Sequence, residues 1–305
     1  MNEQTPTLAL KDVTKRFDNF TAVDHLSFTV RSGRIFGFLG PNGAGKTTTI
    51  RMIVNITAPD EGSIELFGNH INSELQDRIG YLPEERGLYK KMKVSDQLRF
   101  FGALKNITSK LAEERIDFWL DKMKLKEWKE KKATELSKGM QQRIQFIAAI
   151  MHDPDLLILD EPFSGLDPRS VKDLIEIILE LKQRGKTIIF STHMMETAEK
   201  LCDDICLINH SRKVLSGSLR EVKKGFGRNA VALRAEGGNG VLSDKSLIAH
   251  IKQHSDESEL LLAEEADPQE LLRRLIASNA TITKFELIEP SLNEIFLEMT
   301  KEVGA

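Results

Sequence analysis

Cysteine, tryptophan and tyrosine are scarce in this chain. Its 305 residues include only 2 Cys, 2 Trp and 2 Tyr. Both cysteines, Cys202 and Cys206, stand in KLCDDICLI with no third Cys and no cluster of metal-ligating residues beside them, which argues against a disulfide framework and a cysteine-rich metal site. We therefore expect buried, reduced thiols, as is typical of a cytoplasmic protein.

Long apolar runs are also missing, and neither sign of charge predominates. No uninterrupted apolar segment is long enough to cross a bilayer, and the start MNEQTPTLAL lacks a basic segment followed by an apolar core. We therefore expect neither a membrane-spanning nor an exported protein. The formal net charge of -3 gives no long-range attraction to nucleic acid. Apolar and charged shares of 40% and 29% are those of a globular protein.

The order of the patterns predicts an α/β fold. LALKDVTKRF and AVDHLSFTV alternate as antiparallel strands do, with the turn-prone DNF between them. RIFGFLG followed by GAGKTTTIRMIV indicates a strand, a tight loop and a helix. LLILD and TIIFST are strand-like and flank the amphipathic helix SVKDLIEIILELKQR, which is the arrangement of a parallel sheet.

The length of the chain favours two domains, because one core rarely organises 305 residues. A charged helical insert is expected at about residues 94–150. The composition becomes glycine-rich near GFGRNAVALRAEGGNG, which predicts a large domain over residues 1–224 and a small α+β domain over residues 225–305. In the small domain, Asp267 with Glu270 and Ser291 with Glu294 predict capped helix starts.

A phosphate-binding loop follows the predicted strand RIFGFLG. GPNGAGKTT matches the P-loop pattern and stands between a strand and a helix, as that motif requires. Its glycines let backbone amides face phosphate oxygens at a helix start, where the partial positive charge favours an anion. Lys46 adds a full charge, and Thr47 supplies a hydroxyl to Mg²⁺. The predicted ATP-binding residues are Gly40, Pro41, Asn42, Gly43, Ala44, Gly45, Lys46, Thr47 and Thr48.

Two carboxylates follow the buried-strand pattern LLILD. Asp160 is predicted to hold Mg²⁺, and Glu161 to act as the general base on the attacking water. An acidic strand end by itself is more often a solvated terminus. Because the P-loop is present in the same chain, we favour the catalytic interpretation.

ELSKGMQQR, at Glu135 to Arg143, resembles the signature motif of the ABC ATPases, a family of P-loop proteins. The resemblance implies that Ser137 and Gly139 contact the γ-phosphate of an ATP bound by a second copy in a head-to-tail homodimer. A helix start aimed at an anion is the physical reason. A plain N-cap serine is the alternative.

Further segments resemble the family in the order that it requires. SGLD is similar to its D-loop, which implies a nucleotide contact for Asp167, and His193 in STHMMETAE is similar to its switch histidine. Phe17 resembles the aromatic residue that stacks on adenine, with Phe20 as the other candidate. A histidine taken alone is usually structural, and His193 is selected for its place after TIIFST.

Two positions depart from the family pattern. Glu84 stands where the family commonly has glutamine, and its carboxylate could reach Mg²⁺ or water. Lys138 replaces the first signature glycine, and we expect it to be tolerated because Ser137 and the amides remain. The Glu84 variant and the ending SLNEIFLEMT resemble bacterial sodium- and drug-exporter ATPases.

The resemblance therefore implies an ATP-hydrolysing subunit of an ABC transporter, an exporter, held at the inner face of the cell membrane by a separate permease. Leu88, Tyr89 and Met92 are the candidate permease anchors, and packing against the helical insert is the alternative role for them. A solvated helix face is favoured for KLKEWKEKK over a phospholipid or nucleic-acid site. A soluble ABC protein acting on ribosomes or DNA, and a regulatory module without turnover, are the alternatives. The resemblance also implies that the transported substrate is selected mainly by the permease and is not specified by this sequence.

Overall fold

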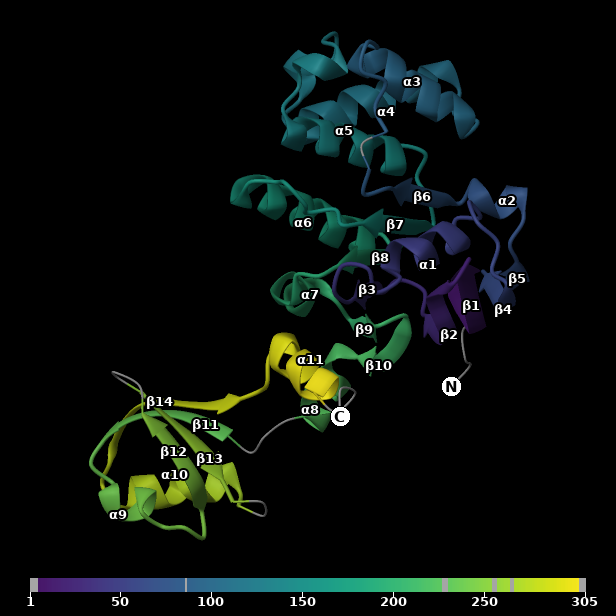
Figure 1. Cartoon of the computed structure of the whole chain (residues 1–305). Coiled ribbons are helices and arrows are strands. Elements are labelled where there is room, and N and C mark those ends of the chain that lie inside the picture. Colours follow the sequence, from purple (N-terminus) through teal and green to yellow (C-terminus); the bar gives the residue numbers. More distant parts are fainter. Residues whose placement is uncertain (1–4, 86, 227–229, 254–256, 264–265, 302–305) are drawn as a thin grey trace. The chain divides into compact units, whose positions relative to one another are not determined.

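Two units, each with its own core, make up the chain (Figure 1). The computed structural model describes residues 5–85, 87–226, 230–253, 257–263 and 266–301. The larger unit comprises Met1–Leu219 and the smaller comprises Arg220–Ala305. This division falls at the start of helix α8 (Leu219–Gly225), a few residues before the predicted boundary.

A six-stranded, mostly parallel sheet forms the centre of the larger unit, in the order β10-β9-β3-β8-β7-β6. Every residue of β3 and β7 is buried, as expected of strands covered on both faces. The carboxyl ends of β3, β7 and β8 lie at one edge because these strands are parallel neighbours. The strands are β3 (Ile35–Leu39), β6 (Ile79–Leu82), β7 (Leu156–Asp160), β8 (Thr187–Thr192), β9 (Asp204–Asn209) and β10 (Arg212–Ser218).

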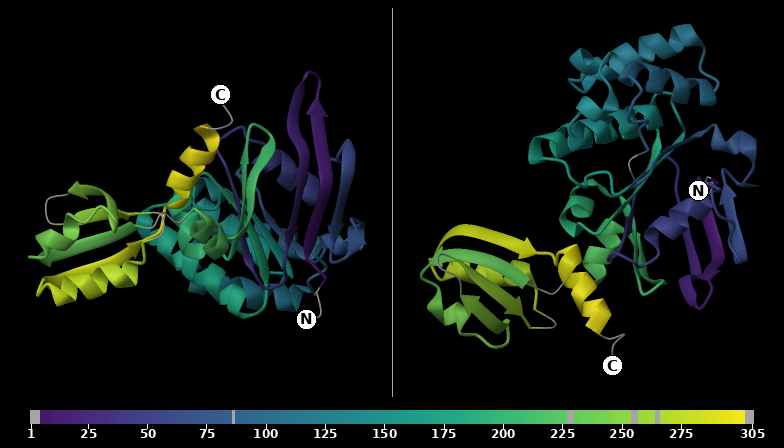
Figure 2. Two further views of the ribbon diagram at one scale, coloured as in Figure 1. Left: turned by 90° about the horizontal axis from the view of Figure 1, so that it is seen from below. Right: turned by 45° about the horizontal axis from the view of Figure 1, so that its top comes forward.

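An antiparallel sheet stands beside the parallel one, as the sequence predicts (Figure 2). Helix α1 (Lys46–Ile53) packs into the core that joins them, together with Leu8, Phe28 and Phe36. The rings of Phe28 and Phe36 stack with their centroids 5.2 Å apart. The strands, in sheet order, are β2 (Phe20–Val30), β1 (Leu8–Phe17), β4 (Glu61–Leu66) and β5 (Asn69–His70).

The remaining helices include the predicted insert. That insert consists of α3 (Val94–Leu104), α4 (Ser109–Lys122) and α5 (Lys138–Ile150). The others in the larger unit are α2 (Ser73–Gln76), α6 (Pro168–Gln183), α7 (Met195–Leu201) and two 3₁₀ turns at Lys126–Trp128 and Ala133–Glu135. Among the described residues, no helix combines the length and apolar character needed to cross a membrane.

Both cysteines are buried and unpaired, as predicted. Burial raises the pKa of the Cys206 thiol to about 12 and raises that of Cys202 further. The two thiols therefore stay protonated at neutral pH and behave as small apolar side chains.

In the smaller unit, a four-stranded antiparallel sheet carries helix α10 on one face. Leu271 and Leu275 of α10 pack onto Leu260 and other apolar residues of the sheet. Ser291 and Glu294 form the predicted reciprocal cap. The elements are β11 (Ala230–Glu236), α9 (Asn239–Leu242), β12 (Ile248–Gln253), β13 (Ser258–Leu262), α10 (Pro268–Ala277), β14 (Thr281–Ile288) and α11 (Leu292–Lys301).

Only one of the two hydrogen bonds of the other predicted capping box, at Asp267 and Glu270, is formed. Asp267 accepts a hydrogen bond from the amide of Gln269 at 2.9 Å, as an N-cap residue does. Glu270 instead binds Arg274, one turn further along the helix, at 2.9 Å. An i,i+4 ion pair thus replaces the return hydrogen bond of a full capping box.

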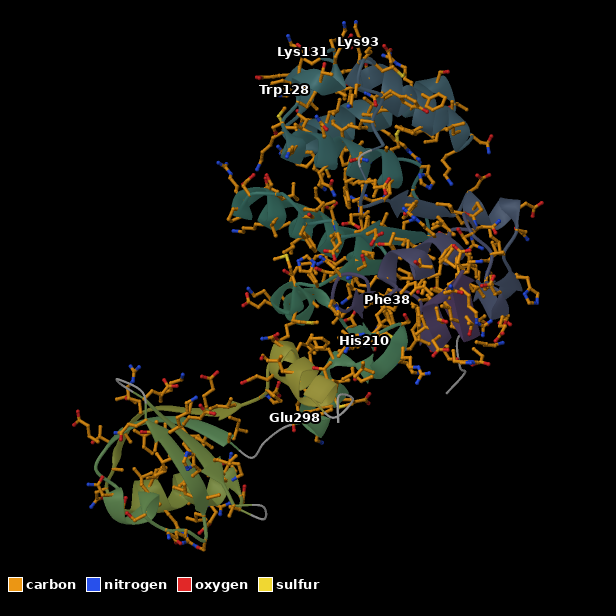
Figure 3. The ribbon with its side chains drawn as sticks, viewed as in Figure 1. Phe38, Lys93, Trp128, Lys131, His210 and Glu298 are labelled. Atoms are coloured by element: carbon orange, nitrogen blue, oxygen red, sulfur yellow. The ribbon has the colours of Figure 1, made fainter. Side chains whose placement is uncertain are left out.

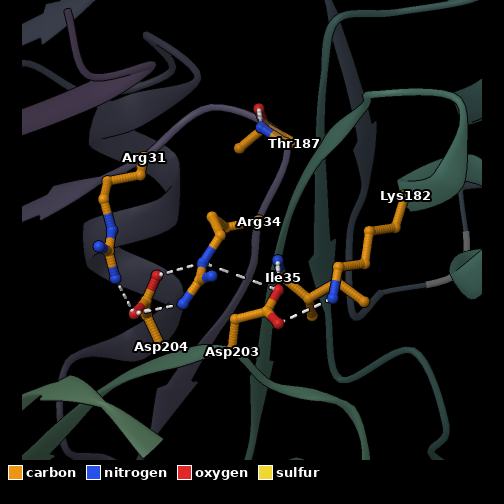
Figure 4. Close-up of polar contacts among 8 residues, drawn as sticks. Arg31, Arg34, Ile35, Lys182, Thr187, Asp203 and Asp204 are labelled. Atoms are coloured by element: carbon orange, nitrogen blue, oxygen red, sulfur yellow. Dashed lines mark hydrogen bonds and ion pairs between the residues drawn. The ribbon is translucent and has the colours of Figure 1, made fainter. Parts of the chain in front are cut away.

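An ionic network ties the beginnings of β3 and β9 together (Figure 4). Asp204 accepts from Arg31 at 2.5 Å and from Arg34 at 3.1 Å. Asp203 accepts from Lys182 at 2.7 Å and from the amide of Ile35 at 2.9 Å. Burial alone would raise the pKa of Asp203, but the hydrogen bonds from Lys182 and the Ile35 amide outweigh it and lower that pKa.

Replacing Asp203 by Asn should lower the free energy of unfolding of the larger unit by about 1–3 kcal/mol at neutral pH, because Lys182 loses its anionic partner. The folded-state pKa of Asp203 is lowered, so its stabilisation is present above 3.8, its ordinary value, and is lost as the pH falls through the lowered value. Wild type and variant should therefore converge in strong acid. Urea unfolding followed by the fluorescence of Trp119 and Trp128 reports this unit alone.

Asp155→Asn is the matched control. Asp155 pairs with Arg78 at 2.7 Å, but both side chains are about half exposed, so its loss should cost less than about 1 kcal/mol. Equal losses in the two variants would show that the network of Asp203 is no stronger than a surface ion pair.

Candidate active site

The P-loop turns between β3 and α1, and two of its glycines have no room for a side chain. A Cβ atom on Gly40 would lie 2.3 Å from the carbonyl oxygen of Ile208, and one on Gly45 would lie 2.3 Å from that of Ala22. Gly45 also has a φ of 105°, which residues with a side chain rarely adopt. The loop is thus held against β9 and β2, and the free amides at the start of α1 remain available for an anion.

Lys46 is folded back into this loop. Its side chain is buried, and Nζ donates to the carbonyl oxygens of Gly40 at 2.8 Å and Pro41 at 3.1 Å. Ala44 is buried beneath the loop. A cavity of about 410 Å³ opens above it, and its lining residues are Phe20, Ala22, Asn42, Gly43, Gly45, Lys46, Thr47, Thr48, Glu84 and Glu161.

Asp160, at the end of β7, is fully buried. Its Oδ1 accepts a hydrogen bond from the Ser191 hydroxyl, whereas Oδ2 has no hydrogen-bond partner among the described residues. Burial raises the pKa of Asp160, and the nearby charge of Glu161 raises it further. Buried carboxylate oxygens are normally paired, so this oxygen is a candidate ligand for a cation or an acceptor for a hydrogen-bond donor.

Glu161 contacts two other predicted site residues, His193 and Lys46. It has a φ of 47°, a left-handed conformation that costs a non-glycine residue about 1–3 kcal/mol. Its Oε1 lies 3.0 Å from Nδ1 of His193 and 3.6 Å from Nζ of Lys46. The predicted base, the predicted switch histidine and the P-loop lysine therefore meet at one carboxylate oxygen.

Ser191 is a site residue that the sequence motifs do not identify. Its hydroxyl bonds to Asp160 and also accepts from the amide of Glu161 at 3.1 Å. Asp160 and Ser191 are direct partners in the register of β7 and β8. A polar residue at the end of TIIFST, next to LLILD in a parallel sheet, is the signal that would have pointed to it.

Glu84 lies where two cavities meet. Together with Thr47 it lines both the P-loop cavity and a second cavity of about 350 Å³, which Asp160 and Tyr81 also line. Burial, helped by the charge of Asp160, raises the pKa of Tyr81 to about 12, so its hydroxyl stays protonated. Glu84 is thus placed close to the predicted magnesium ligands.

The two candidate adenine-stacking residues lie on either side of the β1–β2 turn and pair with each other. Phe20 lines the P-loop cavity. Phe17 is not among the residues that line it, and Nζ of Lys15 lies 5.4 Å from the centroid of the Phe17 ring. The structure therefore favours Phe20, although the family resemblance had pointed first to Phe17.

The predicted residues that do not line the P-loop cavity include three at the starts of α5 and α6. Ser137 is exposed and caps α5 by accepting from the amide of Met140. Gly139 follows it in the first turn of that helix. Asp167 caps α6, where it accepts from Ser170, and this hydrogen bond lowers the pKa of Asp167. A single copy thus forms only the P-loop half of the predicted composite site.

Comparison with known proteins identifies the family. A model described as ABC transporter matches residues 23–164. The chain is 44% identical to the ABC transporter ATP-binding protein YhaQ of Bacillus subtilis over 298 residues, which cover 98% of this chain and 99% of that protein. This chain belongs to the ABC transporter ATP-binding proteins. Members of the family bind ATP, hydrolyse it to drive transport, and work with membrane permeases.

Other similarities extend over both units. A model for the C-terminal domain of DrrA1-3-like ATP-binding proteins matches residues 217–300. Nod factor export ATP-binding protein I of Ralstonia nicotianae is 34% identical, with 97% of this chain and 94% of that protein covered. These relatives favour transport over the ribosome- and DNA-directed alternatives.

Solved structures confirm the predicted P-loop fold. An ATP-binding subunit of an ABC transporter aligns with a TM-score of 0.68 at 30% identity, covering 72% of this chain and 93% of that one. The cbiO1 protein of Clostridium perfringens, part of an ABC transporter complex, aligns with a TM-score of 0.64 at 25% identity, covering 72% and 90%.

Replacing Phe20 by Ala should weaken ATP binding by about 5-fold to 100-fold, because stacking on a base contributes about 1–3 kcal/mol. Phe17→Ala is the matched control, since Phe17 is a similarly exposed residue of the same turn and should leave affinity nearly unchanged. Inorganic triphosphate, which has no base, should bind both variants equally in a competition assay. A loss confined to Phe17→Ala would place the base on Phe17.

Proposed function

We propose that this chain is the ATP-hydrolysing subunit of an exporter and works as a head-to-tail homodimer at the inner, cytoplasmic face of the cell membrane. Residues 1–224 are the nucleotide-binding domain and residues 225–305 an accessory domain. The observation that carries the ATPase proposal is the meeting of Lys46 and His193 at Oε1 of Glu161, beside the P-loop cavity. Export is supported by the Nod factor export relative.

The contacts of Glu161 suggest how hydrolysis begins. In the structure, Glu161 is the anion paired with the buried charge of Lys46, at 3.6 Å. The phosphates of ATP bring stronger negative charge to Lys46, which releases the carboxylate to accept a proton from water. That water attacks the γ-phosphorus, and the bond to ADP breaks. His193, which contacts Glu161, acts as the positioning residue.

Magnesium fits the residues at the end of β7. Oδ2 of Asp160 is buried with no hydrogen-bond partner in the described part of the chain, and Thr47 and Glu84 line the same cavity as Asp160. These three side chains would hold the ion. Bound Mg²⁺ supplies charge neutralisation for the phosphates. Among the described residues, no cluster of three or more His, Cys, Asp or Glu side chains could hold a metal. ATP oxygens would therefore have to complete the coordination.

The homodimer proposal rests on the distance in the fold between the signature-motif residues and the P-loop cavity of the same copy. Ser137 and Gly139 stand at the start of α5 and are not among the residues that line the P-loop cavity. A second copy in head-to-tail orientation would bring that helix start to the γ-phosphate, where its partial positive charge stabilises an anion. Each of the two sites would then consist of both chains.

Glu161→Gln should reduce ATP hydrolysis by about 100- to 10,000-fold, the usual contribution of a general base, while ATP binding persists. Because Glu161→Gln should bind ATP without hydrolysing it, the variant should form a dimer when ATP is added, as measured by size-exclusion chromatography with light scattering. Adding Ser137→Arg to Glu161→Gln should abolish the dimer but leave ATP bound.

Ser109→Arg, at another exposed helix start, controls for the added arginine. Wild-type turnover in Glu161→Gln would remove Glu161 from the base role. An undiminished dimer in the double variant would contradict the head-to-tail arrangement.

A third, apolar cavity of about 360 Å³ suits the permease. Ile56 and Leu104 are 62% and 61% exposed, yet both line this one hollow. Exposed apolar residues are common singly, but a shared hollow marks an interaction site. The predicted anchors Leu88, Tyr89 and Met92 do not line it; the Tyr89 ring packs on Phe101, which does. We therefore propose Ile56 and Leu104 as the anchors. The remaining lining residues are Val54, Gln76, Ile79, Tyr81, Pro83, Gly87, Phe101, Lys105, Gln145, Ala148, Ala149 and His152.

Replacing Leu104 by Glu should reduce copurification of the permease by at least about tenfold, because a charge in the hollow removes a buried anchor. The isolated subunit should keep its ATPase activity. Ile276→Glu is the control, since Ile276 is 60% exposed and lies on α10 of the other unit. Loss of ATPase in Leu104→Glu would make the hollow structural, and unchanged copurification would place the permease elsewhere.

A further inference from the structure

Two lysine-rich segments that are distant in the sequence run side by side at the outer end of the helical insert. The amide of Val94 donates to the carbonyl of Lys131 at 2.9 Å, and the amide of Ala133 donates to that of Met92 at 3.2 Å. Lys93 and Lys132 face each other as an antiparallel bridge. Figure 3 shows Lys93 and Lys131 close together at this end, next to Trp128. We call Lys90, Lys91, Lys93, Lys131 and Lys132 the lysine surface.

The lysine surface carries more positive charge than the neighbouring glutamates neutralise. All five side chains are exposed. Glu130 binds Lys93 at 2.9 Å, and Glu135 lies 3.6 Å from Lys131 and also in the field of Lys132. Lys90 and Lys91 make no ion pair with any residue that the structure describes. Five lysines against two glutamates leave a surplus of three positive charges, although the whole chain has a formal net charge of -3.

Such a surface attracts anions. Like charges directly opposite each other on paired segments repel, and here Lys93 opposes Lys132. Lysine carries a mobile point charge on a flexible stem, which suits spread negative charge better than a single bidentate site. Tyr89 precedes Lys90 in the chain, and its exposed ring lies 5.7 Å from that of Phe100, which is also exposed. Tyrosine is enriched at the membrane interface.

We propose that the lysine surface binds the anionic phospholipid headgroups of the membrane that contains the permease. This replaces the solvated face expected of KLKEWKEKK, the segment that contains Lys131 and Lys132. A protein that works with a permease is held close to that membrane. Each lysine near an anionic leaflet increases membrane partitioning about fivefold. This contact is separate from the ATP site and from the apolar hollow that we assign to the permease, so it can be tested on the isolated full-length chain.

The test is sedimentation of the full chain with phosphatidylcholine vesicles that contain or lack phosphatidylglycerol. Binding should require phosphatidylglycerol and should decrease as salt is added. A triple variant, Lys90→Gln, Lys91→Gln and Lys132→Gln, should lose on the order of a hundredfold in partitioning. These three lysines contribute no ion pair among the described residues, so ATPase activity and folding should be unchanged.

The matched control changes the same number of exposed lysines elsewhere, at Lys110, Lys200 and Lys245, to Gln. It keeps the net charge equal to that of the triple variant and should bind vesicles as the wild type does. Equal losses in the two variants, or equal binding to vesicles without phosphatidylglycerol, would overturn the proposal. So would wild-type vesicle binding by the triple variant together with loss of permease copurification, which would assign the surface to an acidic segment of the permease.

Discussion

The parallel pairing of β3 with β8 and of β8 with β7 is the constraint on which the rest of the larger unit depends. In this register Leu39 faces Thr192, and Asp160 faces Ser191. The carboxyl ends of these three strands therefore lie at one edge of the sheet. The P-loop follows β3 there, the carboxylates stand at the end of β7, and the histidine loop follows β8. Strands buried on both faces cannot slip without exposing apolar side chains, so this edge stays aligned.

The edge concentrates charge that the fold must balance. Lys46, Asp160 and Glu161 are all buried, and burying an isolated ion would be costly. The P-loop carbonyls and Glu161 satisfy Lys46, and Ser191 satisfies one oxygen of Asp160. Within the part of the chain that the structure describes, the other oxygen of Asp160 has no hydrogen-bond partner, and the first amides of α1 have none within the helix. These groups suit a cation and an anion side by side, which is the pairing that magnesium and a nucleotide phosphate would present in the proposed function.

Two further surfaces of the larger unit are proposed to bind partners, and they differ in polarity. The hollow lined by Ile56 and Leu104 is apolar and suits a protein segment, whereas the lysine surface is exposed and charged. Tyr89 stands between them, because its ring packs on Phe101 at the wall of the hollow and it precedes Lys90 in the chain. We infer that the hollow provides specificity for the permease and that the lysines provide less specific attraction to the surrounding membrane.

The sequence by itself determined the elements whose signals are local. GPNGAGKTT, LLILDEP and the strand and helix patterns around them specify the α/β core because phosphate binding and buried strands each require particular residues at adjacent positions. Tertiary structure alone decided which residues meet across distance: Phe20 rather than Phe17 at the cavity, Ser191 beside Asp160, Ile56 with Leu104, and Lys93 opposite Lys132. The physical reason is that a short motif constrains only its own backbone, whereas these contacts depend on the register and packing of segments far apart in the chain.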